Sequence, residues 1–467
     1  MRIFLVSNRV AVPGEGQGIN TGGLEVALRA VLQGHACVWV GWSGNIVDDE
    51  SAVEVHTTHS GNSEFVVTDL QKQEYEEYYN GFANRVLWPV LHYRQDLAEF
   101  HRQDLSGYFH ANHRFADLLC SQLRPDDVIW VHDYHLMPLA QILRERGVTN
   151  RIGFFLHIPM PPPEVVAAMP GHRRVIGALA EYDLVGFQTE SDMSNFARYL
   201  AKISGTTPHF AVSLAGRSVR IGAFPVGIET ETFQEMAVAG QNSPTVRALK
   251  AISPHLAIGV DRLDYSKGLD LKLDAYGRFL KANPDWIGKV TLLQITPKSR
   301  SAIAEYATME TTLATMSGRI NSDFGDVLWT PVRYVTRPYP RKDLAGFFRI
   351  ARAGVVTPLR DGMNLVAKEY VAAQDAEDPG VLVLSEFAGA AAEFESALIV
   401  NPNDPEAVAQ ALLKALTMPR EERISRHARL WQALLANDIA NWGTRFLETL
   451  TGKAPAREIA AKDFAAE

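Results

Sequence analysis

The segment 261-DRLDYSKG-268 places two basic residues within a turn-rich stretch directly after an apolar run. Arg262 and Lys267 lie close enough in sequence for both side chains to converge on one anionic group. Arginine offers a planar fork of donors and lysine a mobile point charge, a combination suited to a diphosphate. Two solvated surface charges are the commoner outcome for such a pair, but the position after an expected strand favours an anion site.

A second polar junction, 358-PLRDGMNLVAKEYVAAQ-374, joins another apolar run to a helical pattern. We expect the helix to begin at Met363 or Asn364, where free N–H groups and the helix dipole would attract a phosphate. Gly362 would let the backbone approach such a ligand closely. The junction is therefore a candidate phosphate site.

Two carboxylates of this junction could bind sugar hydroxyls. Asp361 comes just before the expected turn, and Glu369 lies about two helical turns further on, roughly on the same face. Glu369 could hold the ribose hydroxyls of a nucleotide. Helix capping by Asp361 and an ion pair for Glu369 are the structural alternatives, but they do not explain why both acids share one face.

Two glycine-rich stretches are candidate ligand sites. In 20-NTGGLEVALRAVLQ-33, two glycines precede an amphipathic helix. Their backbone N–H groups could point at a ligand, or the glycines could simply allow the turn from a loop into a helix. The glycine spacing in 14-GEGQG-18 does not fit a dinucleotide fingerprint.

Aromatic and histidine-rich motifs give weaker signals. The rings of 75-YEEYYNGFANRVLWPVLHYR-94 are expected mostly in the core, with one or two lining a pocket. The segment 132-HDYH-135 is interpreted as a buried pair. No ligand spacing indicates a metal site.

The elements that must position these residues are near-continuous apolar runs alternating with helical patterns, which is typical of parallel strands covered on both faces. The expected strands are 2–7, 37–41, 128–133, 152–157, 183–188, 256–261, 289–295, 353–358 and 380–385. Helical patterns include 111–123, 423–450, and 404–417 with Asp404 as its N-cap. Polar clusters follow most of the strands, where ligands of parallel sheets bind.

The length of 467 residues and the strand–helix alternation predict an α/β protein with two parallel sheets. We place the boundary near 240–250, where 239-AGQNSPT-245 is small, polar and turn-forming. The expected domains are 1–240 and 241–440. Residues 441–467 are expected to form a helix that crosses back, followed by an exposed tail.

The composition of the chain argues against several classes of protein. A net charge of −8 and a pI of about 6.0 argue against general affinity for nucleic acid or an anionic membrane. Cys37 and Cys120 are the only cysteines, which excludes a disulfide framework and suits a reducing cytosol. No apolar stretch is long enough for a membrane span. A cytoplasmic protein is expected.

These motifs together resemble the trehalose-6-phosphate synthases, retaining glucosyltransferases of family 20. The matching segments are 6-VSNRV-10, 21-TGGL-24, 78-YYNGFANRVLWP-89, 130-WVHDYHLMP-138, 153-GFFLHIPMP-161, 183-DLVGFQT-189, 260-VDRLDYSKG-268 and 357-TPLRDGMNLVAKEYVAAQ-374. The resemblance implies the GT-B fold, two facing Rossmann-like domains with parallel sheets and a catalytic cleft between them. It makes 1–240 the acceptor-binding domain and 241–440 the nucleotide-sugar-binding domain.

The resemblance also implies roles for individual residues. The acceptor glucose 6-phosphate would be held by Arg9, Tyr79, Trp88, Asp133 and Arg300, with Trp88 and Ile158 selecting its α-anomer. The donor would be held by Gly22, Gly23, Arg262, Lys267, Tyr339, Asp361, Gly362, Met363, Asn364, Leu365, Val366, Ala367, Lys368 and Glu369. The residues expected in catalysis are Arg262, Lys267, Asp361 and His157.

The implied reaction transfers glucose, with retention, from a nucleotide sugar to O1 of glucose 6-phosphate, which gives α,α-trehalose 6-phosphate. UDP-glucose is the expected donor. The leaving diphosphate would accept the proton, so no protein nucleophile is required. No cofactor is expected, with Mg²⁺ at most a non-structural activator. The expected partners are the two substrates and further copies of the chain in a homodimer or homotetramer, with neither nucleic acid nor membrane.

Several alternatives stay open at this point. A sister glucosyltransferase would use glycerol 3-phosphate or a cyclitol phosphate, although the full acceptor set argues against it. Leu91 replaces an expected phenylalanine, and 160-MPPPE-164 departs from the family pattern, so the acceptor is not fixed. A nicotinamide dehydrogenase lacks its fingerprint, and an inactive sensor predicts gaps that are not found. The donor base, UDP against ADP or GDP, is also undecided.

Overall fold

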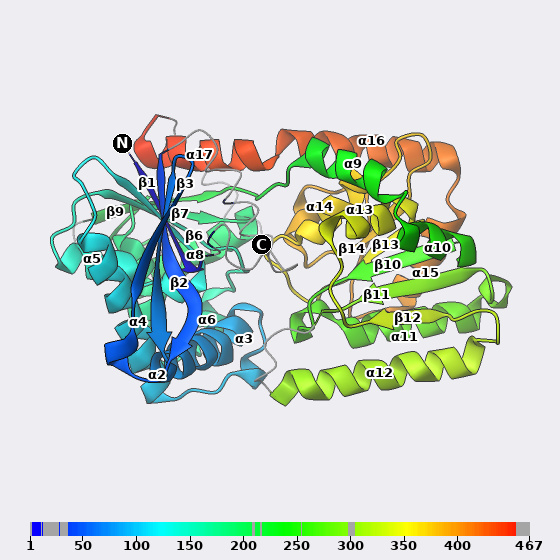
Figure 1. The fold of residues 1–467 in the computed structure, drawn as a ribbon, viewed down its shortest axis with the longest axis horizontal. Helices are drawn as coiled ribbons and strands as arrows, with labels where there is room; N and C mark the ends of the chain where they lie inside the picture. Colours follow the sequence, from blue (N-terminus) through cyan, green and yellow to red (C-terminus); the bar gives the residue numbers. More distant parts are fainter. Residues whose placement is uncertain are drawn as a thin grey trace. The chain divides into compact units, whose positions relative to one another are not determined.

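The computed structural model describes residues 2–10, 12, 28, 36–207, 211–214, 217–253, 255–297 and 304–453. These residues form two compact units, each built on its own β-sheet (Figure 1). One unit comprises the described residues up to Pro225 together with those from Trp442 onwards, and the other comprises Val226–Asn441. The prediction of an α/β protein with two sheets is confirmed.

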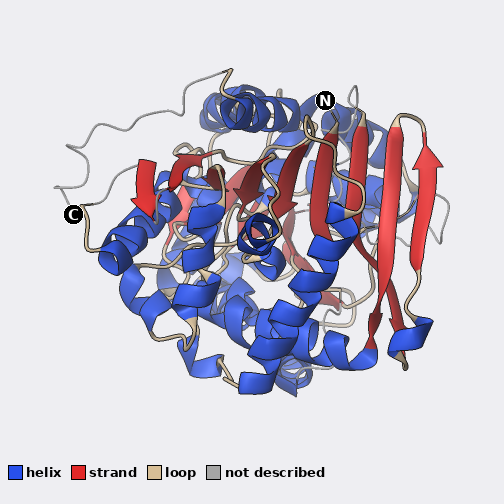
Figure 2. Cartoon of the chain, turned by 90° about the vertical axis from the view of Figure 1, so that its left-hand side faces the viewer, coloured by secondary structure: helices blue, strands red, loops and turns tan. Residues whose placement is uncertain are grey.

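The described part of the first unit contains a nine-stranded sheet in the order β3-β4-β2-β1-β5-β6-β7-β9-β8. Its strands are β1 (Ile3–Arg9), β2 (Cys37–Val47), β3 (Val55–Ser60), β4 (Ser63–Gln71), β5 (Val128–His132), β6 (Arg151–Phe155), β7 (Leu184–Phe187), β8 (Ala211–Leu214) and β9 (Arg217–Ala223). Figure 2 shows these strands lying side by side with a progressive twist. All neighbours pair in parallel except the β3–β4 and β8–β9 hairpins.

The two strands at each margin of this sheet, β3 and β4 on one side and β9 and β8 on the other, are the ones that the apolar runs did not predict. β3 reads VHTTHS and is almost wholly exposed, so it carries no apolar signal. Strands at a sheet edge are often short and polar, because an apolar edge would invite pairing with another chain. The purely parallel first sheet that we expected is therefore wrong at its two antiparallel margins.

The helical elements of the first unit follow the strands in alternation. They are η1 (Glu50–Ala52), α2 (Lys72–Glu74), η2 (Tyr75–Leu87), α3 (Trp88–Leu91), η3 (Gln95–Leu97), α4 (Arg102–Cys120), η4 (Tyr134–Leu136), α5 (Leu139–Glu145), α6 (Pro163–Ala167), α7 (His172–Val175), η5 (Gly177–Glu181), α8 (Glu190–Ser204) and α17 (Ile439–Thr451). η2 is a π-helix, a rare form that is enriched at functional sites. It packs closely on α4, since a Cβ on Gly81 would lie 2.6 Å from Asp104 Cγ.

The second unit holds a six-stranded sheet in its described part, parallel throughout, in the order β12-β11-β10-β13-β14-β15. Its strands are β10 (His255–Val260), β11 (Val290–Ile295), β12 (Val332–Val335), β13 (Ala353–Val356), β14 (Val381–Ser385) and β15 (Leu398–Val400). The helical elements are α9 (Thr230–Gly240), α10 (Pro244–Ile252), η6 (Tyr265–Lys267), α11 (Leu269–Ala282), η7 (Pro284–Trp286), α12 (Ala304–Phe324), α13 (Arg341–Ile350), α14 (Leu365–Ala373), η8 (Gly389–Ala392), α15 (Pro405–Thr417) and α16 (Arg420–Ala436). Asp404 caps α15 as predicted, accepting a hydrogen bond from Ala407 N at 3.1 Å.

The boundary between the units lies earlier than the predicted 240. Helix α9 precedes that position, but it packs against α13 and α14 of the second unit. The approach to α13 is so close that a Cβ on Gly240 would lie 2.1 Å from the carbonyl oxygen of Lys342. The polar stretch after Gly240 is therefore a turn between α9 and α10, within one unit, and the change of unit falls at Pro225.

The single helix predicted over 423–450 is two helices, α16 and α17 (Figure 1, orange to red). The break follows Ala436, and Asp438 Oδ1 accepts a hydrogen bond from Asn441 N at 2.7 Å, as an N-cap does. From Trp442 onwards the chain belongs to the first unit, as the predicted crossing back requires. Most of the expected exposed tail, from residue 454, lies outside the described residues.

Helix α17 completes the core of the first unit. Phe446 is fully buried and its ring stacks on Trp130 at 4.4 Å between centroids. Gly153 of β6 and Gly186 of β7 make room for this ring, because a Cβ on either would lie 2.8 Å from it. Among the helices of the described chain, none is long and apolar enough to cross a membrane.

We predict that Phe446→Ala destabilises the protein by about 3–5 kcal/mol, the usual cost of removing a buried phenylalanine ring. The measurement is urea denaturation followed by tryptophan fluorescence. Thr444→Ala is the matched control, since Thr444 lies exposed on the same helix and should change the free energy of unfolding by less than about 0.5 kcal/mol. Equal effects of the two variants would show that α17 is not part of the core.

Candidate active site

The second unit holds an ion pair between the two segments that the sequence singled out. Lys267 Nζ donates to Asp361 Oδ2 at 2.5 Å, and the two side chains are only 11% and 16% exposed. The β10–α11 and β13–α14 loops that carry them are tied together by a hydrogen bond from Leu359 N to Ser266 O at 2.7 Å. Gly268 supports this approach with φ +59°, a conformation that other residues rarely adopt.

Arg262 lies on the same β10–α11 loop as Lys267 and has an exposed side chain. Both basic residues thus follow the carboxyl end of β10, where ligands of parallel sheets bind. The lysine is positioned by its carboxylate partner. The loop can therefore offer a fixed ammonium group and an exposed guanidinium to an anion.

The β13–α14 junction is built around Asn364. Helix α14 begins at Leu365, one residue later than the latest predicted start, because Asn364 is the N-cap and accepts from Ala367 N at 3.1 Å. Asn364 has φ +75° and also donates to Asp361 Oδ2 at 2.9 Å. Asp361 is therefore not the N-cap. Its carboxylate accepts from both Lys267 and Asn364, while its backbone pairs with the loop after β14.

The other residues expected at the donor site, at the start of α14 and just before it, differ in how far their side chains are buried. Met363 and Ala367 are buried, and Leu365 and Val366 are half-buried. The Lys368 side chain is also buried, where it pairs with Glu393 and donates to Val226 O at 2.9 Å. Only the backbone of Lys368 can face a ligand.

Glu369 is held by Arg341 at the first turn of α13. The carboxylate and guanidinium are 3.7 Å apart, and Arg341 also lies 4.0 Å from Glu229. Burial raises the pKa of Glu369 to about 7, and Arg341 acts in the opposite direction. Glu369 is 23% exposed, so an acid that titrates near neutral pH remains accessible to a ligand.

Tyr339 precedes α13 and packs on its Phe347, with ring centroids 5.3 Å apart. Arg337 lies over the Tyr339 ring at 5.0 Å. The aromatic residue expected near the nucleotide base is thus part of a small ring-and-cation cluster.

In the first unit, Trp42 brings Arg9 and Tyr79 together. Arg9 follows the apolar part of β1, and its guanidinium lies 5.8 Å from the Trp42 ring. Tyr79, on η2, is also 5.8 Å from that ring. Gly44 leaves room for the arginine, since a Cβ there would lie 2.8 Å from Arg9 Nη2. Trp42 lies within β2 and was not among the residues predicted from the sequence.

Asp133 and His157 meet at the carboxyl ends of β5 and β6. Asp133 has φ +73°, uncommon for a residue other than glycine, and its N–H donates to Phe155 O at 2.8 Å. Its Oδ1 accepts from His157 N at 3.3 Å. A residue held in such a conformation next to a strand end is often functional.

His157 contacts a second histidine. Its Nε2 lies 3.1 Å from Nδ1 of His132, which is completely buried. Burial lowers the pKa of His157 to about 3 and that of His132 well below its ordinary value, so both rings are neutral. The buried pair expected within 132-HDYH-135 therefore includes His157, which is distant in sequence. His135 stacks instead on Tyr79.

Trp88 and Ile158, expected to select the acceptor anomer, are both buried, at 4% and 8% exposed. Trp88 packs on Tyr134 with centroids 5.7 Å apart and on the adjacent His92. Three of the six rings in the aromatic segment, Tyr78, Phe82 and Trp88, are buried, and the other three are half-buried, so fewer rings lie in the core than predicted. Leu91 is likewise buried at 1%, so its departure from the family pattern is a change of packing. Gly22, Gly23 and Arg300 lie outside the described residues.

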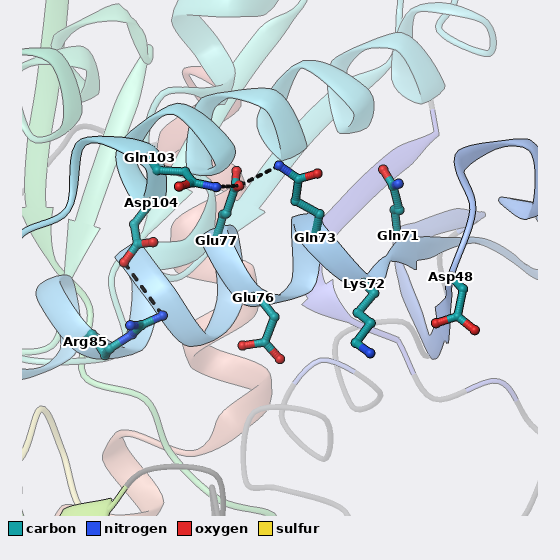
Figure 3. Close-up of a pocket in the computed structure, with 9 residues that line it drawn as sticks. All are labelled: Asp48, Gln71, Lys72, Gln73, Glu76, Glu77, Arg85, Gln103 and Asp104. Carbon is teal, nitrogen blue, oxygen red and sulfur yellow. Dashed lines mark hydrogen bonds and ion pairs between the residues drawn. The ribbon is translucent and has the colours of Figure 1, made fainter.

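A cavity of about 500 Å³ opens beside η2, and none of the predicted site residues that the structure describes is among the residues that line it (Figure 3). Its lining is polar or charged: Asp48, Gln71, Lys72, Gln73, Glu76, Glu77, Arg85, Gln103 and Asp104. Glu77 accepts hydrogen bonds from Gln73 and Gln103, and Arg85 lies 3.8 Å from Asp104. We assign the cavity no ligand. Across the described ranges, no cluster of His, Cys, Asp and Glu could hold a metal ion.

Comparison with known sequences identifies relatives over nearly the whole chain. The profile of glycosyltransferase family 20 matches residues 16–452. The trehalose-6-phosphate synthase of Sinorhizobium fredii (strain NBRC 101917 / NGR234) is 49% identical over 458 residues, which cover 97% of this chain and 99% of that protein.

Solved structures agree with the sequence relatives. The alpha,alpha-trehalose-phosphate synthase (UDP-forming) from Burkholderia xenovorans in complex with glucose-6-phosphate superposes with a TM-score of 0.93 at 44% identity, covering 97% of this chain and 100% of that one. An E. coli structure bound with UDP-2-fluoro glucose gives a TM-score of 0.90 at 43% identity, with 96% and 99% covered. The chain therefore belongs to glycosyltransferase family 20.

Proposed function

We propose that the protein transfers glucose from UDP-glucose to glucose 6-phosphate and releases α,α-trehalose 6-phosphate and UDP. The observation that carries the proposal is the fixed Lys267–Asp361 pair beside the capped start of α14. This arrangement offers positive charge to a diphosphate and carboxylate oxygen to sugar hydroxyls. Relatives are named for this reaction, and two of the similar structures hold glucose-6-phosphate or a UDP-sugar analogue.

Catalysis would rest mainly on stabilising the leaving group. As the bond from the glucose anomeric carbon to the diphosphate breaks, negative charge grows on the phosphate oxygens. Lys267 and Arg262 supply positive charge to those oxygens, and charge placed in advance is among the largest contributions to enzymatic rates. The new bond forms from O1 of glucose 6-phosphate, whose proton passes to the leaving phosphate.

The charges of the described acids and bases fit a mechanism without a protein nucleophile. Asp361 accepts hydrogen bonds from Lys267 and Asn364, which weakens its carboxylate as a nucleophile. His157 has a pKa of about 3, so at neutral pH its ring is uncharged and cannot act as a general acid in the imidazolium form. Both residues would bind sugar hydroxyls. Retention would then result because the acceptor attacks the anomeric carbon on the same face from which the diphosphate leaves.

The acceptor would bind in the first unit. Arg9 has an exposed guanidinium suited to the 6-phosphate, and Tyr79 lies beside it on Trp42. Asp133 would accept from a sugar hydroxyl. We propose that no cofactor takes part and that Mg²⁺ at most activates. We also propose a homodimer or homotetramer in the cytoplasm, where Cys37 and Cys120 would stay in their free state.

The first experiment pairs UDP-, ADP- and GDP-glucose with glucose 6-phosphate or glycerol 3-phosphate and identifies the product by mass spectrometry. We expect trehalose 6-phosphate, formed fastest with UDP-glucose. Product from glycerol 3-phosphate alone would refute the proposed acceptor. A faster reaction with ADP- or GDP-glucose would refute the donor.

Arg262→Ala should lower kcat/KM for the donor by on the order of a hundred- to a thousandfold, because one contact to the developing charge is lost. Arg319→Ala, at an exposed arginine on α12 of the same unit, is the matched control and should leave the rate unchanged. Full activity of Arg262→Ala would remove this residue from the mechanism.

UDP-glucose binding should strengthen between pH 6 and pH 8. Glu369 has a pKa of about 7, so it is mostly protonated at the lower pH and mostly ionised at the higher, where it accepts better from ribose hydroxyls. The dissociation constant from titration calorimetry should fall by up to about tenfold over this range. In Glu369→Gln the dependence should disappear, and a dependence retained in that variant would assign the titration to another group.

A further inference from the structure

The contact between His132 and His157 joins a buried ring to one that a ligand can reach. Nδ1 of His132 and Nε2 of His157 are 3.1 Å apart, so one of these nitrogens carries the proton and the other accepts it. His132 is completely buried at the end of β5, whereas His157 is partly exposed after β6. The direction of this hydrogen bond decides which ring nitrogen of His157 bears its proton.

The surroundings of His132 fix that direction. Its Nε2 is buried and has no hydrogen-bond partner among the described residues. The ring lies between Trp130, at 4.7 Å between centroids, and Trp442, at 6.3 Å. A buried N–H without a partner is rarer in proteins than a buried acceptor without one. The proton of neutral His132 therefore belongs on Nδ1, where it is donated to His157.

We propose that His132 is a positioning residue that fixes His157 in the tautomer with its proton on Nδ1. With Nε2 occupied as an acceptor, Nδ1–H is the ring group left for a ligand, and within the described chain it makes no hydrogen bond. His157 then acts as a hydrogen-bond donor to a hydroxyl oxygen of the transferred glucose. This role rests on the proposed function, whereas the tautomer itself does not.

Helix α17 holds the pair in place. Trp442, the residue at which the chain returns to the first unit, lies 6.0 Å from the His157 ring and contacts Phe155 edge-on at 5.1 Å. Burial by these rings also lowers the pKa of both histidines, so neither becomes charged near neutral pH. Tautomer, rather than charge, is what His132 controls.

The direct test is ¹⁵N–¹H correlation spectroscopy of the full-length protein with ¹⁵N-labelled histidine at neutral pH. The long-range pattern of His157, assigned by its loss in His157→Gln, should show a protonated Nδ1 and an unprotonated Nε2. In His132→Phe, the signal should change towards the Nε2–H form that free imidazole side chains favour. A protonated Nε2 in the unsubstituted protein, or an unchanged pattern in His132→Phe, would overturn the proposal.

Kinetics supply the second readout. His132→Phe should lower kcat by on the order of ten- to a hundredfold, the usual effect of removing a partner that orients a functional histidine. KM for glucose 6-phosphate should stay within about twofold. His132→Asn keeps a donor near the position of Nδ1 and should recover most of kcat. Equal losses in both variants would mean that His132 is structural only.

The two readouts separate failure of this inference from failure of the proposed function. If the unsubstituted protein transfers no glucose but shows the predicted tautomer, the proposed function is wrong and the assignment to His132 stands. If transfer occurs with the opposite tautomer, the function stands and the inference fails.

Discussion

Parallel strand pairing imposes the constraint on which the site residues at the strand ends depend. It places the carboxyl ends of β1, β5 and β6 at one edge of the first sheet, and those of β10 and β13 at one edge of the second. Residues far apart in sequence therefore become neighbours without any contact between them being specified locally. Lys267 and Asp361, 94 positions apart, form their ion pair only because β10 and β13 lie side by side. The same holds for Asp133 and His157 on β5 and β6.

The polar groups at these strand ends and on α14 differ in charge. Lys267 compensates Asp361 next to the start of α14, so in the proposed reaction its charge is already in place for a leaving diphosphate. Glu369 is an acid with a raised pKa near Arg341, suited to hydroxyl recognition at neutral pH. His132 and His157 are neutral by burial, so neither ring acts as a proton carrier near neutral pH. The charged pair lies in the second unit and the neutral histidine pair in the first.

The sequence predicted the central strands because buried parallel strands must be continuously apolar, and it predicted the polar residues at their ends. It did not predict β3, β4, β8 or β9 in the first sheet, or β12 and β15 in the second. β3 lies exposed at the edge of its sheet and carries no apolar signal. The boundary was misplaced because α9 belongs to the second unit through packing against α13 and α14, which a local turn signal does not reveal. The His132–His157 contact and the role of Trp42 required tertiary structure, since neither partner signals the other in sequence. Lys368 was expected among the donor-binding residues, but its side chain is buried against Glu393.

The measurement that tests the central claim most directly is a crystal structure of the protein with UDP bound. The account predicts diphosphate oxygens within hydrogen-bond distance of Lys267 Nζ and the Arg262 guanidinium, with the ribose hydroxyls on the Glu369 carboxylate. A diphosphate bound away from the β10–α11 loop, or a ribose that leaves Glu369 paired only with Arg341, would contradict it.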